Sequence, residues 1–126
     1  MYSTNYRDTL ITVSTDCPMA AGTVPGKPGT IASLQHAMLA GQPYALTSDD
    51  LLFAVHAERH PGAVREDFFA RPQACLRASP LVKQFGWGIH HDSEARIALV
   101  PMESAEYQRL LADDTVKKTP GMRSKR

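Results

Sequence analysis

The chain has 126 residues, which is the size of one domain rather than two. Hydrophobic residues make up 43% of it and charged residues 21%, values that are ordinary for a soluble globular protein and that exclude disordered, collagen-like and coiled-coil chains. The formal net charge is +1, but the last ten positions hold five of the 14 basic residues and none of the 13 acidic ones. We therefore predict one mildly acidic globular domain over residues 1–116, followed by a basic tail over residues 117–126.

The first residues do not resemble a secretion signal. Arg7 and Asp8 precede an apolar patch that runs only from Leu10 to Val13, and no run approaches the ~20 apolar residues of a membrane span. We therefore expect a cytoplasmic protein that does not associate with a membrane, in which Cys17 and Cys75 are reduced. No feature of the sequence sets the oligomeric state.

Alternating side chains predict a first strand near residues 8–14. Three prolines and three glycines then fall between residues 18 and 29, and a connection this long is expected either to be mobile or to cover part of the domain. A helix is predicted from about Thr30 to Gly41. Its predicted buried stripe consists of Ile31, Leu34, Ala37 and Met38.

The run "LTSDDLLFAVHAERHPG" predicts the next helix. Thr47 or Ser48 can cap its first turn, where Asp49 and Asp50 complement the helix dipole, and Gly62 ends it. A short helix over residues 63–70 follows, closed by Arg71-Pro72.

His56 and His60 lie four residues apart on the helix that begins near Thr47. This spacing places them on one face, where such a pair can bind a transition metal. Glu58 does not follow the first histidine directly, as it does in zinc proteases, and no third ligand is evident. An exposed histidine pair near a helix end is the favoured interpretation, and we predict no metal.

The run "SPLVKQFG" is a complete short helix, with Ser79 as its cap, Pro80 at the first helical position and Gly86 as its end. A hairpin is predicted over residues 87–101, with "SEA" as its loop. In that register Asp92 lies opposite Arg96, and one face of the hairpin carries Trp87, Ile89, His91, Ile97 and Leu99.

An amphipathic helix over residues 103–112 completes the prediction. The fold class is α+β, with a small antiparallel sheet made of the strand near residues 8–14 and the hairpin near residues 87–101. Four or five short helices are predicted to pack against this sheet.

The helix start near Ser79 is a candidate anion site. The helix offers backbone N–H groups, Arg77 lies two residues before its cap, and Lys83 is predicted to project back toward the same end. Against this site, Pro80 removes one donor and the Ser79 hydroxyl can occupy another. The alternative is that Arg77 pairs with a carboxylate of the protein.

Cys75 and Trp87 are the other candidates in this region. Cys75 with His90 or His91 can form a thiolate–imidazole pair, although a buried structural cysteine is the favoured interpretation. Trp87 lies between two glycines and can stack on a flat ligand, although a core role is favoured. His90 would lie on the opposite, more accessible face, where it is a general acid/base candidate.

Four segments carry a resemblance to a known family. They are "TSDDLLF" at 47–53, "CLRASPLVKQFGWGIHHD" at 75–92, "RIAL" at 96–99 and "MRSKR" at 122–126. They resemble, in the same order, a family of small, single-domain, mainly bacterial proteins of unknown function. The resemblance implies one cytoplasmic domain and assigns no catalytic or binding residue. Ala95 stands where that family usually has a glycine in the turn.

The leading functional hypothesis is a small binding or interaction module for an anionic small molecule or partner. Its predicted ligand-binding residues are Arg77, Ser79, Lys83, Trp87 and His90. The first alternative is a small enzyme that uses Cys75 or His90. The second is a nucleic-acid binder that uses the basic tail, although we expect no appreciable binding at physiological salt. No cofactor is predicted.

Overall fold

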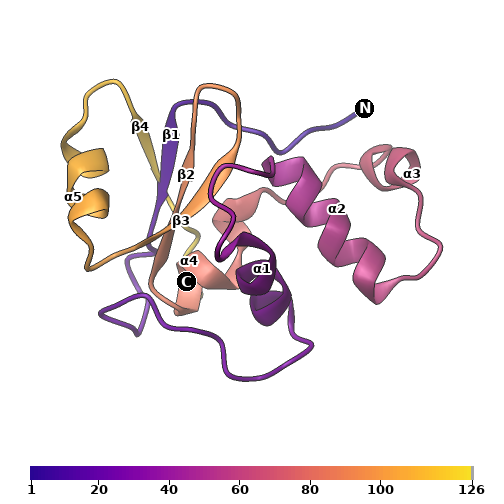
Figure 1. Ribbon diagram of the computed structural model, residues 1–126, viewed down its shortest axis with the longest axis horizontal. Helices are drawn as coiled ribbons and strands as arrows, with labels where there is room; N and C mark the ends of the chain where they lie inside the picture. The colour runs from indigo at the N-terminus through magenta and orange to yellow at the C-terminus, as the bar shows by residue number, and fades with distance from the viewer. Residues whose placement is uncertain (126) are drawn as a thin grey trace.

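The computed structural model describes residues 1–125 and has one four-stranded sheet (Figure 1). The strand order is β3-β2-β1-β4, in which β2 pairs antiparallel with β1 and with β3, and β4 pairs parallel with β1. The strands are β1 (Thr9–Thr12), β2 (Trp87–His91), β3 (Ile97–Pro101) and β4 (Lys117–Pro120).

Residues 1–125 also form five α-helices. They are α1 (Ile31–Leu39), α2 (Ser48–Arg59), α3 (Arg65–Phe69), α4 (Pro80–Gln84) and α5 (Ala105–Ala112), and a 3₁₀ turn covers Leu76–Ala78. Helix α5 lies on one side of the sheet, and α1, α2 and α4 lie on the other (Figure 1). This architecture confirms the predicted α+β class. Within residues 1–125, no helix has both the length and the apolar character that crossing a membrane requires.

Each face of the sheet has its own apolar core, since strand residues alternate between the faces. On the α1 side, Ile11 and Ile89 are fully buried against helix residues such as Leu51 and Val82. On the α5 side, Leu10 and Val100 pack with residues of α5 and with Val116. The sheet is therefore covered on both faces.

Local signals place the helix ends as predicted. Thr47 accepts a hydrogen bond from the backbone N–H of Asp50, whose carboxylate in turn accepts from the backbone N–H of Thr47. Ser79 caps α4 by accepting from the backbone N–H of Leu81, and Pro80 is the first helical residue. Gly86 has a φ of 79°, the left-handed conformation predicted at that helix end.

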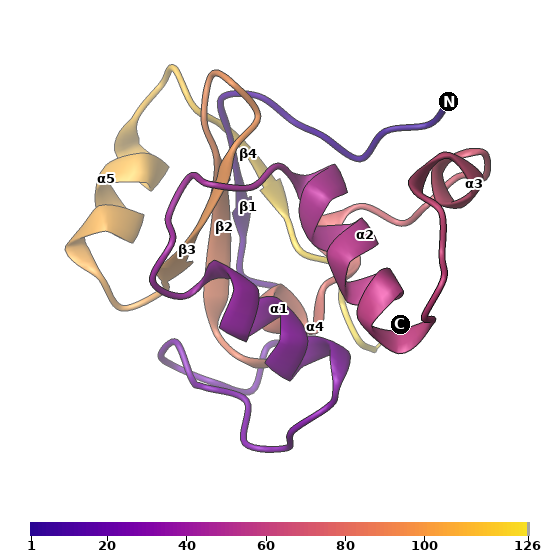
Figure 2. The ribbon, with the colours of Figure 1, turned by 45° about the vertical axis from the view of Figure 1, so that its right-hand side comes forward.

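Asp49 does more than complement the dipole of α2. Its carboxylate accepts hydrogen bonds from the backbone N–H and the hydroxyl of Thr4 and from the hydroxyl of Ser3. Tyr2 donates its backbone N–H to the carbonyl oxygen of Phe69. These bonds fix the N-terminal segment along α2 and α3, as Figure 2 shows.

The hairpin has the predicted register. Ile89 lies opposite Leu99 and His91 lies opposite Ile97, and the backbone N–H of Asp92 donates to the carbonyl oxygen of Arg96. Ala95 takes the left-handed position of the loop with a φ of 66°. The turn therefore forms without the usual glycine, at the cost of a strained conformation.

The sheet is mixed rather than purely antiparallel, because residues 117–120 form β4. Leu10 of β1 lies opposite Lys118, and the backbone N–H of Gly121 donates to the carbonyl oxygen of Thr12. The sequence predicts a basic tail here, and no strand, because "KKTP" has no apolar face. Lysine and proline are, however, suited to an exposed edge strand.

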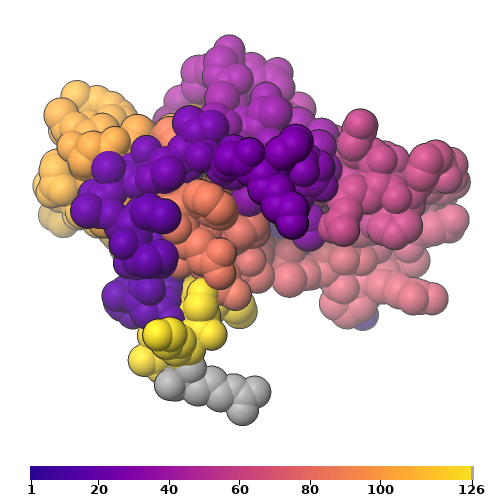
Figure 3. Space-filling model, turned by 90° about the horizontal axis from the view of Figure 1, so that it is seen from below, coloured from indigo at the N-terminus to yellow at the C-terminus, as the bar shows by residue number. Residues whose placement is uncertain are grey.

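The long connection over residues 18–29 covers Trp87. The indole N–H of Trp87 donates to the carbonyl oxygen of Thr23, and the backbone N–H of Thr23 donates to the carbonyl oxygen of Phe85. Figure 3 shows the purple N-terminal third of the chain lying across the orange segment near residue 85. Of the two predicted alternatives for this connection, covering the domain is the one that the contacts support.

The predicted buried stripe of α1 is right for Leu34 and Met38, which are partly buried and pack against the core, and wrong for Ile31 and Ala37. The buried residues are Ala32, Gln35 and Leu39, whereas Ile31 is 41% exposed and Ala37 is exposed. The helix is rotated so that the polar side chain of Gln35 faces inward. There its side-chain oxygen, Oε1, accepts a hydrogen bond from the Ser79 hydroxyl. A pattern of apolar residues alone cannot show this rotation.

Candidate functional site

The surface between α1, α2, α3 and residues 74–80 is hollowed around Ile31. Three cavities share this side chain in their linings, with volumes of about 470, 160 and 170 Å³. The residues that line more than one of them are Ile31, Gln35, Leu52, Arg59 and Pro80. We call these three cavities the Ile31 groove and refer to each as one arm.

The three arms differ in their walls. The wide arm, of about 470 Å³, has Pro25, Lys27 and Phe85 in its lining. The α2 arm, of about 160 Å³, extends to His56 and His60. The third, of about 170 Å³, is the Cys75 arm, and Ser79 lines it as well. Apolar walls with few polar groups are typical of small-molecule sites, and such sites often lie between helices.

The charges at the groove are of one sign. Lys27 lines the wide arm, and Arg59 lines both the wide arm and the α2 arm. Both residues are exposed, and neither forms an ion pair within residues 1–125. No acidic residue lines any of the three arms. The groove therefore favours an anionic group over a cationic one.

The polar group at the bottom of the groove is the Gln35 amide. The side chain is 2% exposed and lines the α2 arm and the Cys75 arm. The Ser79 hydroxyl accepts the N–H of Leu81 and donates to Gln35 Oε1 at 2.6 Å, which fixes the orientation of the amide. Among the hydrogen bonds of residues 1–125, the Gln35 amide takes part through Oε1, with Ser79, and not through Nε2.

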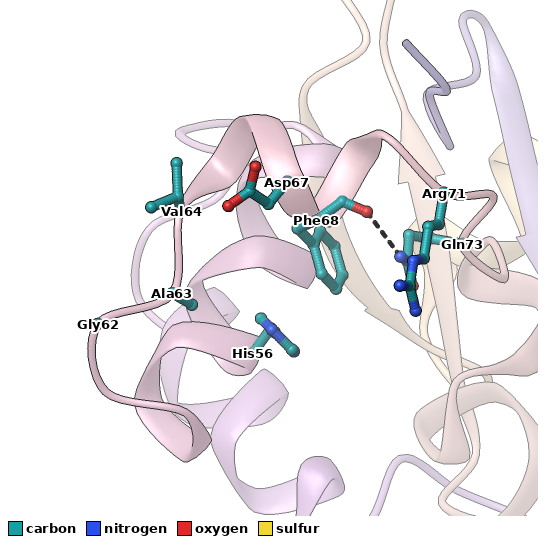
Figure 4. Close-up of a pocket in the computed structure, with 8 residues that line it drawn as sticks. All are labelled: His56, Gly62, Ala63, Val64, Asp67, Phe68, Arg71 and Gln73. Atoms are coloured by element: carbon teal, nitrogen blue, oxygen red, sulfur yellow. Dashed lines mark hydrogen bonds between the residues drawn. The ribbon is translucent and has the colours of Figure 1, made fainter.

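A further pocket of about 450 Å³ lies beside the groove, between α2 and α3 (Figure 4). His56 and Phe68 line both this pocket and the α2 arm, and their rings lie with centroids 4.5 Å apart. The His60 ring stacks on His56 at 4.4 Å. In residues 1–125 no group of three or more metal-ligating side chains is placed to hold an ion.

The structure separates the residues that were predicted to bind an anion. Arg77 is half-buried and donates its Nε hydrogen to the carbonyl oxygen of Pro120 at 2.7 Å, rather than pairing with a carboxylate. Ser79 is 4% exposed and lines the Cys75 arm. Neither Arg77 nor Lys83 is among the residues that line the groove.

Trp87 and His90 lie on opposite faces of β2. The Trp87 ring is half-buried beside His36, with ring centroids 5.3 Å apart. His90 Nδ1 lies 2.7 Å from the Tyr44 hydroxyl oxygen. Burial lowers the pKa of His90, although the nearby carboxylate of Asp92 acts in the opposite direction. Neither residue lines the groove.

Gly88, between them, makes room for α5. A side-chain carbon at this position would lie 2.7 Å from the Tyr107 ring. Close approach by this ring, rather than by a ligand, explains this glycine.

Cys75 contacts a tyrosine rather than a histidine. Its Sγ lies 3.1 Å from the Tyr6 hydroxyl oxygen, and the Tyr6 ring stands edge-on to the His91 ring at 5.3 Å. This hydrogen bond and burial raise the pKa of Tyr6. Cys17 and Cys75 are both free. Of the candidate site residues named from the sequence, Cys75 and Ser79 line the Cys75 arm of the groove, and His56 and His60 line its α2 arm.

Sequence reasoning did not identify Ile31, Gln35, Lys27 or Arg59 as site residues. The available signal was a polar residue, Gln35, at the centre of a predominantly apolar helix. Its partner Ser79 is 44 residues away, so the pairing is visible only in the fold.

The fold and the groove together define a small α+β domain with a depression of ligand size between its helices. All of residues 1–126 match the model of a family of unknown function, DUF6157, and the chain belongs to that family. This confirms the family resemblance found in the sequence. No curated protein and no solved structure matches the chain.

Proposed function

We propose that the protein is a small binding module and that its ligand is an organic carboxylate with an apolar body, bound in the Ile31 groove. The observation that supports this proposal best is the charge of the groove, since Lys27 and Arg59 stand at apolar walls that include no acidic residue. The class of ligand is the one predicted from the sequence. The site is different, because Arg77 and Lys83 lie outside the groove.

The apolar walls supply most of the affinity. Covering about 150 Å² of apolar ligand and protein surface contributes on the order of 4 kcal/mol. Each exposed cation adds at most about 1 kcal/mol when it pairs with a carboxylate in contact with water. The two cations therefore orient the ligand and select its charge, while the exposed Ile31 and its neighbours hold its body.

The test uses 5-phenylpentanoate and its neutral counterpart 5-phenylpentan-1-ol, each titrated into the protein by calorimetry. We expect the acid to bind with a dissociation constant on the order of 1 mM or lower, and the alcohol to bind several-fold more weakly. Replacing both cations, in Lys27→Gln/Arg59→Gln, should weaken the acid by about tenfold and leave the alcohol unchanged.

The matched control is Arg7→Gln/Lys117→Gln, which removes two exposed cations that do not line the groove. Equal binding of the acid and the alcohol would contradict the proposal. Equal effects of the two double variants would contradict it as well, because the net charge rather than the groove would then govern binding.

A further inference from the structure

Gln35 offers a hydrogen-bond donor at the bottom of the groove, where both narrow arms meet its side chain. Leu52 lines both narrow arms beside Gln35, and Gln35 itself is only 2% exposed. Its Oε1 is already used by the Ser79 hydroxyl. A carboxamide has two donors on its nitrogen, and the hydrogen bond that this amide makes within residues 1–125 uses its oxygen instead. The amide nitrogen is therefore available to donate a hydrogen bond to a ligand in the groove.

The amide is held rather than free to rotate. Ser79 is 4% exposed and is fixed as the cap of α4, because its oxygen accepts the backbone N–H of Leu81 at 3.1 Å. Its proton is then directed to Gln35 Oε1, so the oxygen of the amide rather than its nitrogen faces the Ser79 hydroxyl. A fixed donor loses little conformational freedom when it binds an acceptor.

We propose that Gln35 recognises a carbonyl oxygen on the ligand, so that the groove selects carboxylates whose apolar body carries an oxo group. This inference rests on the proposed function, since it concerns the same groove. Arg59 and Gln35 both line the α2 arm, which places the cation and the donor at one cavity of about 160 Å³, a part of the larger groove. A ligand without the oxo group displaces water from Nε2 without replacing its hydrogen bond and is rejected for that reason.

The probes are 5-oxo-5-phenylpentanoate and 5-phenylpentanoate, which differ only by the carbonyl group. We expect the oxo acid to bind the wild-type protein about fivefold more tightly or better. In Gln35→Met, which keeps the size of the side chain and removes the donor, this ratio should fall to about one. Ser79→Ala is the positioning variant, and it should lower the ratio while the amide is still present.

A second measurement does not depend on any variant folding. The side-chain amide resonances of Gln35, observed in the wild-type protein by nitrogen-edited NMR, should move when the oxo acid is added. The acid that lacks the carbonyl group should leave them nearly unchanged.

The outcomes separate this inference from the proposed function. If neither acid perturbs the backbone resonances around Ile31, both proposals fail. If both acids bind there with equal affinity and the Gln35 amide resonances do not move, the groove binds carboxylates and the role of Gln35 is refuted. A preference for the oxo acid that persists in Gln35→Met also refutes that role.

Discussion

His91 is the least favourably placed polar residue of the core. It is fully buried, neither of its ring nitrogens has a hydrogen-bond partner in the described chain, and the edge of the Tyr6 ring packs against it. Burial lowers its pKa from 6.5 to about 4, so the folded protein holds the neutral imidazole at physiological pH. Such a residue makes the stability of the protein depend on pH.

The unfolded chain binds a proton at His91 below about pH 6.5, whereas the folded protein resists protonation there until about pH 4. The contribution of the neutral imidazole is therefore complete above pH 6.5 and is lost as the pH falls toward 4. We expect this one residue to account for a loss on the order of 3 kcal/mol in unfolding free energy. Urea unfolding of the wild-type protein and of His91→Leu, at intervals across this range, measures it.

The leucine variant should match or exceed the wild-type stability near neutral pH, because it removes an unpartnered buried polar group at similar volume. It should then lose less stability on acidification than the wild-type protein. Parallel pH profiles for the two proteins would show that His91 is not the titrating group.

Among the elements, strand β4 attaches the C-terminal residues to the domain. Lys117 donates its backbone N–H to the carbonyl oxygen of Asp8, and Met122 donates its own to that of Arg77. The Asp16 carboxylate accepts hydrogen bonds from the Ser14 hydroxyl and from the backbone N–H groups of Lys125 and Ser124. These bonds hold the pKa of Asp16 at about 2. The tail is thus attached to the domain as far as Lys125.

We predict that deletion of residues 117–126 lowers the unfolding free energy by about 3 kcal/mol or more, because several backbone hydrogen bonds at roughly 1 kcal/mol each are lost with the strand. Urea denaturation measures this loss. The control replaces Lys117, Lys118, Arg123 and Lys125 by glutamine, and should change stability by less than about 1 kcal/mol. A deletion variant as stable as the full chain would mean that β4 contributes nothing to the sheet.

Local signals predicted most of these elements, and non-local pairing decided the rest. Thr47 and Ser79 act within one turn of their own positions, so their helix ends can be read directly from the sequence. The hairpin register follows from alternation over adjacent segments. Strand β4 pairs with a strand more than 100 residues earlier, and Gln35 turns inward to meet Ser79, so neither feature leaves a local pattern.

For the whole molecule, the arrangement of layers determines where a ligand can bind. Helices cover both faces of the sheet (Figure 1), and residues 18–29 cover Trp87, which is half-buried. Hollows remain between α2 and α3 and, around Ile31, in the space where α1, α2 and residues 74–80 meet. The sequence predicted an anionic ligand at Arg77, Ser79, Lys83, Trp87 and His90. Of these residues, Ser79 lines the groove that we propose as the site, and the other four do not.

Binding of a carboxylate in the Ile31 groove is tested most directly by locating the bound molecule by NMR. With the isoleucine and leucine methyl groups labelled with carbon-13, 5-phenylpentanoate should give intermolecular NOEs from its ring and methylene protons to Ile31 and Leu52, which line the groove. The fully buried Ile89 should give none. Two results would contradict binding in the groove. One is a set of NOEs confined to Leu111, an apolar side chain that is also exposed on α5. The other is the absence of any NOE to Ile31 at a saturating concentration of the probe.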